Sequence, residues 1–188
     1  MLLGWLSASL NDMNRTIVIS LGVALLAIAG LVYALSGSSI PASTLPPSTY
    51  AKDLVLKSQR DGTNPAMHIL TIASKPGAKE QGTINFAGWK LKSRISGYEY
   101  PFPQLVGAQY TYKGIPPTSV SEPISINANR GDQVIVQERG APANDSITVT
   151  NDLTIFHVNI GAQKPVWGAR DIVDLIDASE ALVASTSI

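Results

Sequence analysis

The chain has 188 residues and no cysteine. Disulfides, thiolate metal sites and a cysteine nucleophile are therefore excluded. Imidazoles are scarce as well, because His68 and His157 are the only histidines. Both lie in apolar sequence that is typical of strands. This context favours half-buried structural histidines over catalytic or metal-binding ones.

The sequence also lacks the common catalytic motifs. It contains no HExxH, GxSxG or Walker loop, and the spacing supports no Ser-His-Asp set. Arg130-Gly131-Asp132 spells the adhesion tripeptide, but a tight turn into a strand explains the same residues. Fourteen basic side chains balance fourteen acidic ones, so the net charge does not call for nucleic acid. We expect a protein that is not an enzyme and that binds no cofactor, metal or nucleic acid.

One long uncharged run is present, from Thr16 to Leu35. Twenty helical residues rising ~1.5 Å each cover the ~30 Å of hydrocarbon in a bilayer, so the run predicts a transmembrane helix. A buried soluble helix and a cleaved signal peptide are the alternatives. Because Arg15 precedes the run and the next charge is Lys52, the positive-inside rule places residues 1–15 in the cytoplasm or its membrane interface. The predicted localisation is single-pass in the inner membrane, with extracytoplasmic C-terminal domains.

A tether is predicted to follow the membrane helix. Residues 36–65 are rich in proline and serine, which indicates a semi-extended segment with one short helical turn at 51–58. Beyond Pro65, short β-branched runs are separated by glycine and proline, as in small β domains. Pro116-Pro117 is expected to end the strand at residues 104–113. Strands are expected at residues 67–73, 89–94, 104–113, 122–126, 133–137, 146–150 and 153–160.

One soluble helix is predicted, from Asp171 to Ala184. Asp177, with Glu180 three residues later, fits a capping box that would begin a shorter version of this helix. Strand signals dominate elsewhere in the soluble part. The fold class is therefore mainly β, with an N-terminal transmembrane helix. Two small domains are expected, at residues 66–128 and 129–188, and the second ends in the helix.

Charge is divided unevenly along the soluble part. Residues 52–113 carry nine Lys and Arg against four Asp and Glu, whereas residues 114–188 carry four against nine. Such a chain can join head to tail in a homo-oligomer, or its halves can neutralise each other within one monomer. Solvated strand and helix faces are an alternative explanation. The predicted partner interface consists of Lys90, Lys92, Arg94, Tyr98, Tyr100, Asp171, Asp174 and Asp177.

Glycine and proline punctuate the β region in a particular order. His68 to Leu91 contains a strand, a proline-glycine turn, a second glycine and an aromatic, and Leu105 to Ile126 opens with Leu-Val-Gly. Arg130 to Val136 carries a glycine-aspartate step, and Ser146 to Gly161 reads as a hairpin. This order resembles the Tad/Flp pilus assembly proteins of the CpaB/RcpC family, although Arg130 stands where that family usually has proline.

The resemblance implies a SAF-type β-clip domain at residues 66–128, followed by the second β-rich domain. It also implies a non-enzymatic assembly or scaffold component of an envelope-spanning pilus or secretion machine. The expected partners are the lipid bilayer, further copies of the chain, and an outer-membrane secretin or another envelope protein. A structural subunit of a virion or extracellular filament is the alternative function, and an envelope enzyme or ligand-binding module is a third.

Overall fold

The computed structural model describes residues 42–188, apart from residues 77, 79–81, 114, 139–143 and 152. The predicted cytoplasmic segment 1–15, the membrane helix 16–35 and the beginning of the tether lie outside the described residues. In the part of the chain that is described, no helix is long and apolar enough to cross a membrane. The fold below therefore concerns the predicted tether from residue 42 and the predicted β domains.

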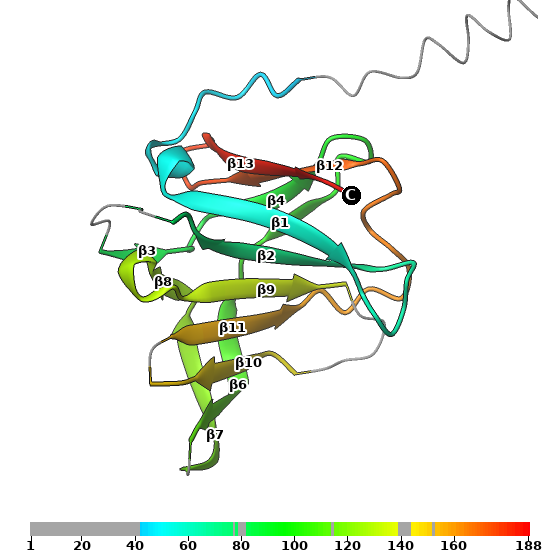
Figure 1. The fold of residues 1–188 in the computed structure, drawn as a ribbon. Helices are drawn as coiled ribbons and strands as arrows, with labels where there is room; N and C mark the ends of the chain where they lie inside the picture. The colour runs from blue at the N-terminus through cyan, green and yellow to red at the C-terminus, as the bar shows by residue number, and fades with distance from the viewer. Residues whose placement is uncertain (1–41, 77, 79–81, 114, 139–143, 152) are drawn as a thin grey trace, which may run out of the picture. The chain divides into compact units, whose positions relative to one another are not determined.

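The described residues form three sheets (Figure 1). The first has seven strands, in the spatial order β1 (Leu54–Arg60), β2 (His68–Ser74), β9 (Gln133–Gln137), β11 (Thr154–Asn159), β10 (Ser146–Val149), β6 (Gln104–Tyr112) and β7 (Ile115–Pro123). The second has four, in the order β13 (Leu182–Ser187), β12 (Ile172–Ile176), β4 (Lys90–Ser93) and β5 (Glu99–Pro101). The third pairs β3 (Thr83–Asn85) with β8 (Ser125–Asn127), and two short 3₁₀ helices, η1 (Thr49–Lys52) and η2 (Ala128–Arg130), complete the fold.

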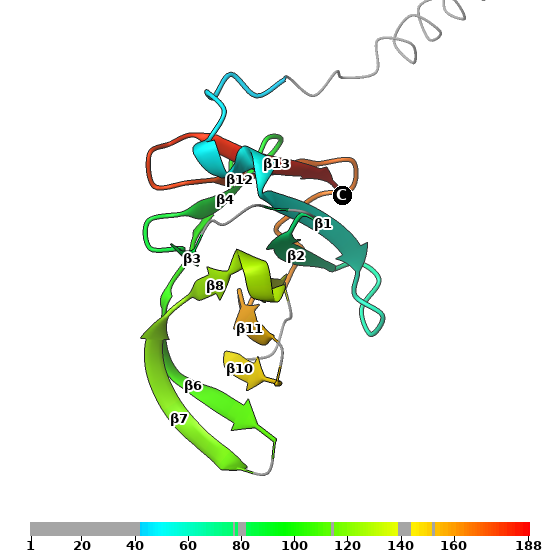
Figure 2. The same cartoon turned by 60° about the vertical axis from the view of Figure 1, so that its left-hand side comes forward.

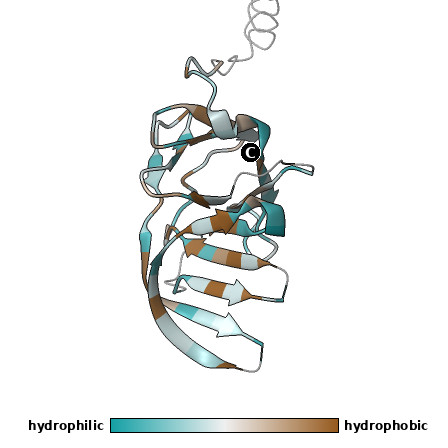
Figure 3. Cartoon of the chain, turned by 90° about the vertical axis from the view of Figure 1, so that its left-hand side faces the viewer, coloured by the Kyte–Doolittle hydropathy of each residue, from teal (hydrophilic) through white to brown (hydrophobic). Residues whose placement is uncertain are grey.

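Alternation of apolar and polar residues explains why these segments form strands. In β4, Leu91 and Ser93 are fully buried, whereas Lys90 and Lys92 are half-buried on the other face. The alternation predicted for residues 89–94 is therefore confirmed. Figure 3 shows hydrophobic and hydrophilic residues alternating along several strands. The mainly β fold class is confirmed as well.

Buried side chains of the two larger sheets share one core. Aromatic rings lie in it, since the centroids of Phe86 and Trp89 are 4.6 Å apart and those of Phe86 and Phe102 are 5.2 Å apart. Offset and edge-on ring pairs at such distances are favourable beyond the area that they bury. These aromatic residues lie in the segments that connect strands of different sheets, with Phe86 between β3 and β4 and Phe102 between β5 and β6.

The two domains predicted at residues 66–128 and 129–188 are not separate in the structure. β2 pairs antiparallel with β9, and β4 pairs antiparallel with β12, so both segments contribute to the same sheets. The described residues from 42 onward belong to one compact unit. The predicted tether also differs, because residues 54–60 form β1 and pair with β2. Periodicity indicates that a segment is a strand but does not identify its partner.

The predicted helix from Asp171 to Ala184 is wrong. This segment is an antiparallel hairpin of β12 and β13. The Asp177 carboxylate accepts hydrogen bonds from the backbone N–H groups of Ser179 and Ala181, at 2.8 and 3.1 Å. Asp forms such local bonds in turns as readily as in helix caps, so the same residues fit both structures. Val173 and Leu175 of β12 are fully buried, and β12 pairs with β4, so this segment is more stable as a strand of the sheet than as a helix.

We predict that Gly88→Ala lowers the free energy of unfolding by about 1–3 kcal/mol, which is the cost of a non-glycine residue in a left-handed conformation. Gly88 has a φ of +78°, and an added Cβ would lie 3.2 Å from the Cβ of Ala178. Urea unfolding measures the change. The control is Gly62→Ala, where no heavy atom lies within 4 Å of the added Cβ. Equal effects of the two substitutions would contradict the prediction.

Candidate functional site

The predicted interface residues gather on the four-stranded sheet, where most of their charges are paired within the chain. Lys90 Nζ lies 2.8 Å from Glu180 Oε2 and 3.4 Å from Glu99 Oε2, and Lys92 Nζ lies 2.7 Å from Glu99 Oε1. The hydrogen bond to Glu180 raises the pKa of Lys90 despite its partial desolvation. The hydrogen bond from Lys92 lowers the pKa of Glu99.

Arg94 and Asp174 form the most buried ion pair of this sheet. The Arg94 side chain is 14% exposed and that of Asp174 is 5% exposed. Arg94 Nε donates to Asp174 Oδ2 at 2.8 Å and Nη2 donates to Oδ1 at 2.7 Å. The Ser185 hydroxyl donates to the same carboxylate at 2.6 Å. This two-pronged geometry raises the pKa of Arg94 and fixes β4 against β12.

The other two predicted aspartates stabilise turns. Asp171 is fully buried and accepts hydrogen bonds from Ser93 Oγ at 2.6 Å and from the Ile172 N–H at 2.7 Å. Asp177 accepts one from Ser48 Oγ at 2.5 Å. Burial alone would raise the pKa of Asp177, but its hydrogen bonds outweigh burial and lower it. No group of three or more potential ligands among the described residues is arranged to hold a metal ion.

Tyr98 and Tyr100 are half-buried beside this cluster, and burial raises the pKa of both hydroxyls. The structure therefore brings the predicted interface residues together on one sheet, but Arg94 pairs with Asp174, and Lys90 and Lys92 pair with other carboxylates of the same chain. The two charged halves of the chain meet within one monomer at this sheet, which was the alternative to joining another molecule.

We predict that Arg94→Gln destabilises the fold by about 3 kcal/mol, because it leaves the buried Asp174 carboxylate without its cation. Lys92→Gln is the matched control. Both members of its pair with Glu99 are about two-fifths exposed, and such a pair contributes at most about 1 kcal/mol. Urea unfolding at low and high salt compares the two variants. If Lys92→Gln lowers the free energy of unfolding as much as Arg94→Gln does, the prediction is contradicted.

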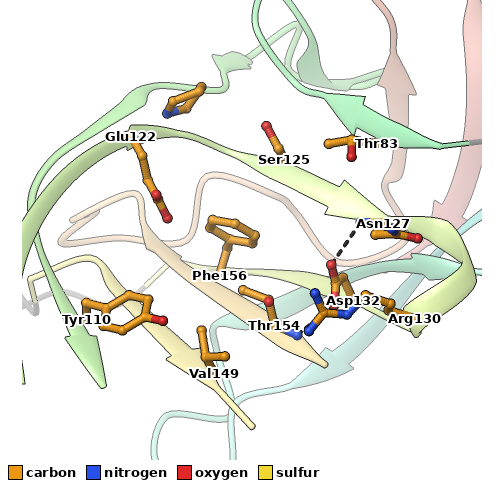
Figure 4. Close-up of a pocket in the computed structure, with 11 residues that line it drawn as sticks. Thr83, Tyr110, Glu122, Ser125, Asn127, Arg130, Asp132, Val149, Thr154 and Phe156 are labelled. Atoms are coloured by element: carbon orange, nitrogen blue, oxygen red, sulfur yellow. Dashed lines mark hydrogen bonds between the residues drawn. The ribbon is translucent and has the colours of Figure 1, made fainter. Parts of the chain in front are cut away.

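A second candidate site is a cleft of about 470 Å³ beside the edge hairpin β6–β7 (Figure 4). Tyr110, Val149 and Phe156 come from β6, β10 and β11 on one side of the cleft. Glu122 and Ser125 come from β7 and β8 on the other side. The lining thus combines aromatic rings with hydroxyl and carboxylate groups, a mixture suited to orienting a bound group.

Asp132 holds one end of this cleft in place. It is 4% exposed and accepts hydrogen bonds from the N–H groups of Asn127, at 2.9 Å, and Thr154, at 2.7 Å. Gly131 before it has a φ of +77°, which turns the chain into β9. The tight turn expected for Arg130-Gly131-Asp132 is thereby confirmed. Its aspartate is committed to the fold instead of being presented to a receptor.

Sequence patterns did not identify this cleft, because its lining comes from elements far apart in the chain. Glu122 is half-buried and Arg130 is exposed, and neither side chain forms a hydrogen bond or ion pair with another described residue. The one local feature that could have pointed to this cleft is Glu122, an acidic residue in a proline-rich segment. These two side chains remain open to a ligand or a partner.

The histidines occupy strands, as expected. His68 is buried in β2, and His157 is half-buried in β11, between Ile135 and Ser146 in the register of the neighbouring strands. Burial lowers the pKa of His157. The unfolded chain therefore binds a proton at a higher pH than the folded chain does.

We predict that His157 makes the fold less stable as the pH falls from ~6.5, the usual histidine pKa, through its lower folded pKa. His157→Gln should remove this part of the pH dependence, because glutamine does not titrate. Urea midpoints of the wild type and the variant at several pH values between neutrality and mild acid measure the difference. Parallel pH profiles for the two proteins would contradict the assignment.

Comparison with models of known protein families and with curated proteins finds no match for this chain. The features that bear on its class are thus the mainly β fold, the charge cluster paired within the chain and the cleft beside the edge hairpin. Membership of the CpaB/RcpC family stays a prediction.

Proposed function

We propose that this chain is a membrane-anchored, non-enzymatic assembly or scaffold protein of an envelope-spanning pilus or secretion machine. In this proposal the helix predicted at residues 16–35 anchors the chain, and the β6–β7 hairpin contacts a partner protein outside the cytoplasm. The observation that carries the proposal is the exposure of this hairpin. The following features of its strands support a role in protein contact.

The hairpin consists of two strands of nine residues each at one edge of the seven-stranded sheet. Figure 2 shows it as a long curved ribbon. Most of β7 is exposed, and Val106 in β6 and Ile115 in β7 are 78% and 50% exposed. A two-stranded ribbon gains little stability by itself. Exposed apolar side chains on such a ribbon are stabilised when a second protein covers them and removes them from water.

The edge itself offers few backbone donors. Pro116, Pro117 and Pro123 lie in β7 and carry no N–H group. Prolines at a sheet edge protect it from indiscriminate pairing with other strands. The remaining stretch, residues 118–122, is short. We therefore favour a partner contact made by side chains of the hairpin over the addition of a long partner strand.

In this proposal the contact lies on the hairpin and not on the partner interface predicted from the sequence. Lys90 and Arg94 already have carboxylate partners within the chain. By contrast, the Glu122 carboxylate at the base of the hairpin has no cationic partner among the described residues. Glu122 and the apolar residues of the ribbon together form a surface with both an apolar and a charged part.

We predict that the double substitution Val106→Asn and Ile115→Asn abolishes co-purification of the partner while changing stability by no more than about 0.5 kcal/mol, as is usual for exposed positions. The measurement is extraction of the full chain from membranes in mild detergent, followed by identification and counting of the co-purified proteins. Low copy number with an outer-membrane protein would support the scaffold. Many identical copies would support the virion or filament subunit instead.

The matched control is Ile95→Asn, since Ile95 is 59% exposed but lies between β4 and β5, away from the hairpin. This variant should keep the partner. If it loses the partner as completely as the hairpin variant does, exposed apolar area in general is responsible and the hairpin has no special role. Retention of the partner by the hairpin variant would refute the proposed contact.

A further inference from the structure

A second cavity, of about 510 Å³, carries an unusual concentration of unpaired basic groups. Arg60 and Arg170 both line it, together with His68 and Trp167. Neither arginine forms an ion pair with a described residue. The remaining lining includes the apolar residues Pro65 and Pro165. The cavity therefore combines two guanidinium groups with an apolar wall.

The two arginines come from distant parts of the chain. Arg60 ends β1 and lies opposite His68 in the register of β1 and β2. Arg170 precedes β12 in a turn that is closed by a hydrogen bond from the Asp171 N–H to the Gly168 carbonyl, at 3.1 Å. Two planar guanidinium forks at one cavity are suited to the oxygens of a phosphate or carboxylate group.

The backbone at Arg170 is strained. Its φ is +67°, in the left-handed region that favours glycine. Arg170 also occupies the third position of its turn, where a positive φ usually selects glycine or asparagine. A strained residue of this kind persists only where the surrounding structure holds it, and such residues cluster at ligand sites. Here the strained position carries a guanidinium group that lines the cavity.

Two buried polar atoms of the lining residues lack hydrogen-bond partners in the described structure. These are Trp167 Nε1 and His68 Nδ1, and the latter lies 3.5 Å from Glu138 Oε2 without forming a hydrogen bond. Trp167 is fully buried and His68 is 8% exposed. Buried groups of this type normally have a partner, and because the Trp167 indole N–H can only donate, an acceptor bound beside it would be favourable.

A buried carboxylate behind these residues does not oppose a bound anion strongly. Glu138 is fully buried, and its oxygens accept hydrogen bonds from the N–H groups of His68 at 2.6 Å, Val166 at 2.6 Å and Trp167 at 3.0 Å. These donors compensate its charge. They also fix β2 and the segment that carries Trp167 against the end of β9. The cavity wall is therefore held in place before any ligand arrives.

We propose that this cavity binds a small organic anion, whose phosphate or carboxylate group contacts Arg60 and Arg170 and whose apolar part packs on the proline-lined wall. The volume of about 510 Å³ exceeds what an inorganic ion needs and falls in the range of small-molecule sites. This ligand site is separate from the β6–β7 hairpin and does not depend on the assembly function proposed above. The anionic group belongs either to a soluble ester or to a lipid headgroup.

The test is calorimetric titration of the full chain, in a non-ionic detergent, with phenyl phosphate. Wild-type protein should bind it with one site per chain, bind inorganic phosphate more weakly, and not bind the neutral analogue benzyl alcohol. Arg60→Gln and Arg170→Gly should each weaken binding of phenyl phosphate by about tenfold or more, since each removes charge-assisted hydrogen bonds. Absence of phenyl phosphate binding to the wild type would overturn the proposal.

Arg170→Gly also separates binding from folding. Glycine adopts a positive φ without strain, so this variant should unfold at the same temperature as the wild type or higher while losing the ligand. Lys57→Gln is the control, because Lys57 is an exposed cation of the same strand as Arg60 but does not line the cavity. Equal weakening by Lys57→Gln, or unchanged binding in both arginine variants, would refute the site.

Two further probes distinguish the sources of the anion. Tighter binding of monomeric dihexanoylphosphatidylglycerol than of glycerol 1-phosphate would identify a lipid headgroup as the ligand. The reverse order would identify a soluble phosphate ester. Both outcomes support the anion site, and failure of both probes to bind would count against it.

Discussion

The pairing of β2 with β9 is the interaction on which the rest of the fold depends. These strands are about sixty residues apart in sequence, and five residue pairs join them as the second and third strands of the seven-stranded sheet. Without this ladder, β1 and β2 would lose contact with the strands that carry the hairpin. Glu138 follows β9 directly and joins it to His68 and Trp167. The pairing thus positions both the edge hairpin and the basic cavity.

Charge has two different roles in this chain. On the four-stranded sheet, opposite charges from the two halves of the sequence meet and are largely neutralised, as in the pair of Arg94 with Asp174. At the basic cavity, Arg60 and Arg170 have no anionic partner among the described residues. The overall charge asymmetry of the sequence does not distinguish these roles. Burial and the presence of a partner do, and both depend on the three-dimensional fold.

Local sequence predicted much of the strand content and little of its arrangement. The strand expected at residues 133–137 has those bounds in the structure, and the two faces of residues 89–94 were assigned correctly. The strand expected at residues 104–113 does end, at Tyr112, but Pro116-Pro117 lie within the next strand, because β7 is at the sheet edge, where proline is tolerated. The helix expected after Asp171 failed because aspartate supports turns and caps alike. The cleft and the cavity were not predictable, since their lining residues meet only through long-range pairing.

The position of β12 has a consequence for synthesis of the protein. β12 lies between β13 and β4, so residues 172–187 supply two of the four strands of the second sheet. Until the ribosome releases this segment, β4 has an open edge and the aromatic core lacks one wall. A nascent chain would then expose apolar surface and unpaired strand edges, the features that chaperones shield and proteases recognise. Folding of this unit is therefore expected to wait until residues 172–187 have left the ribosome.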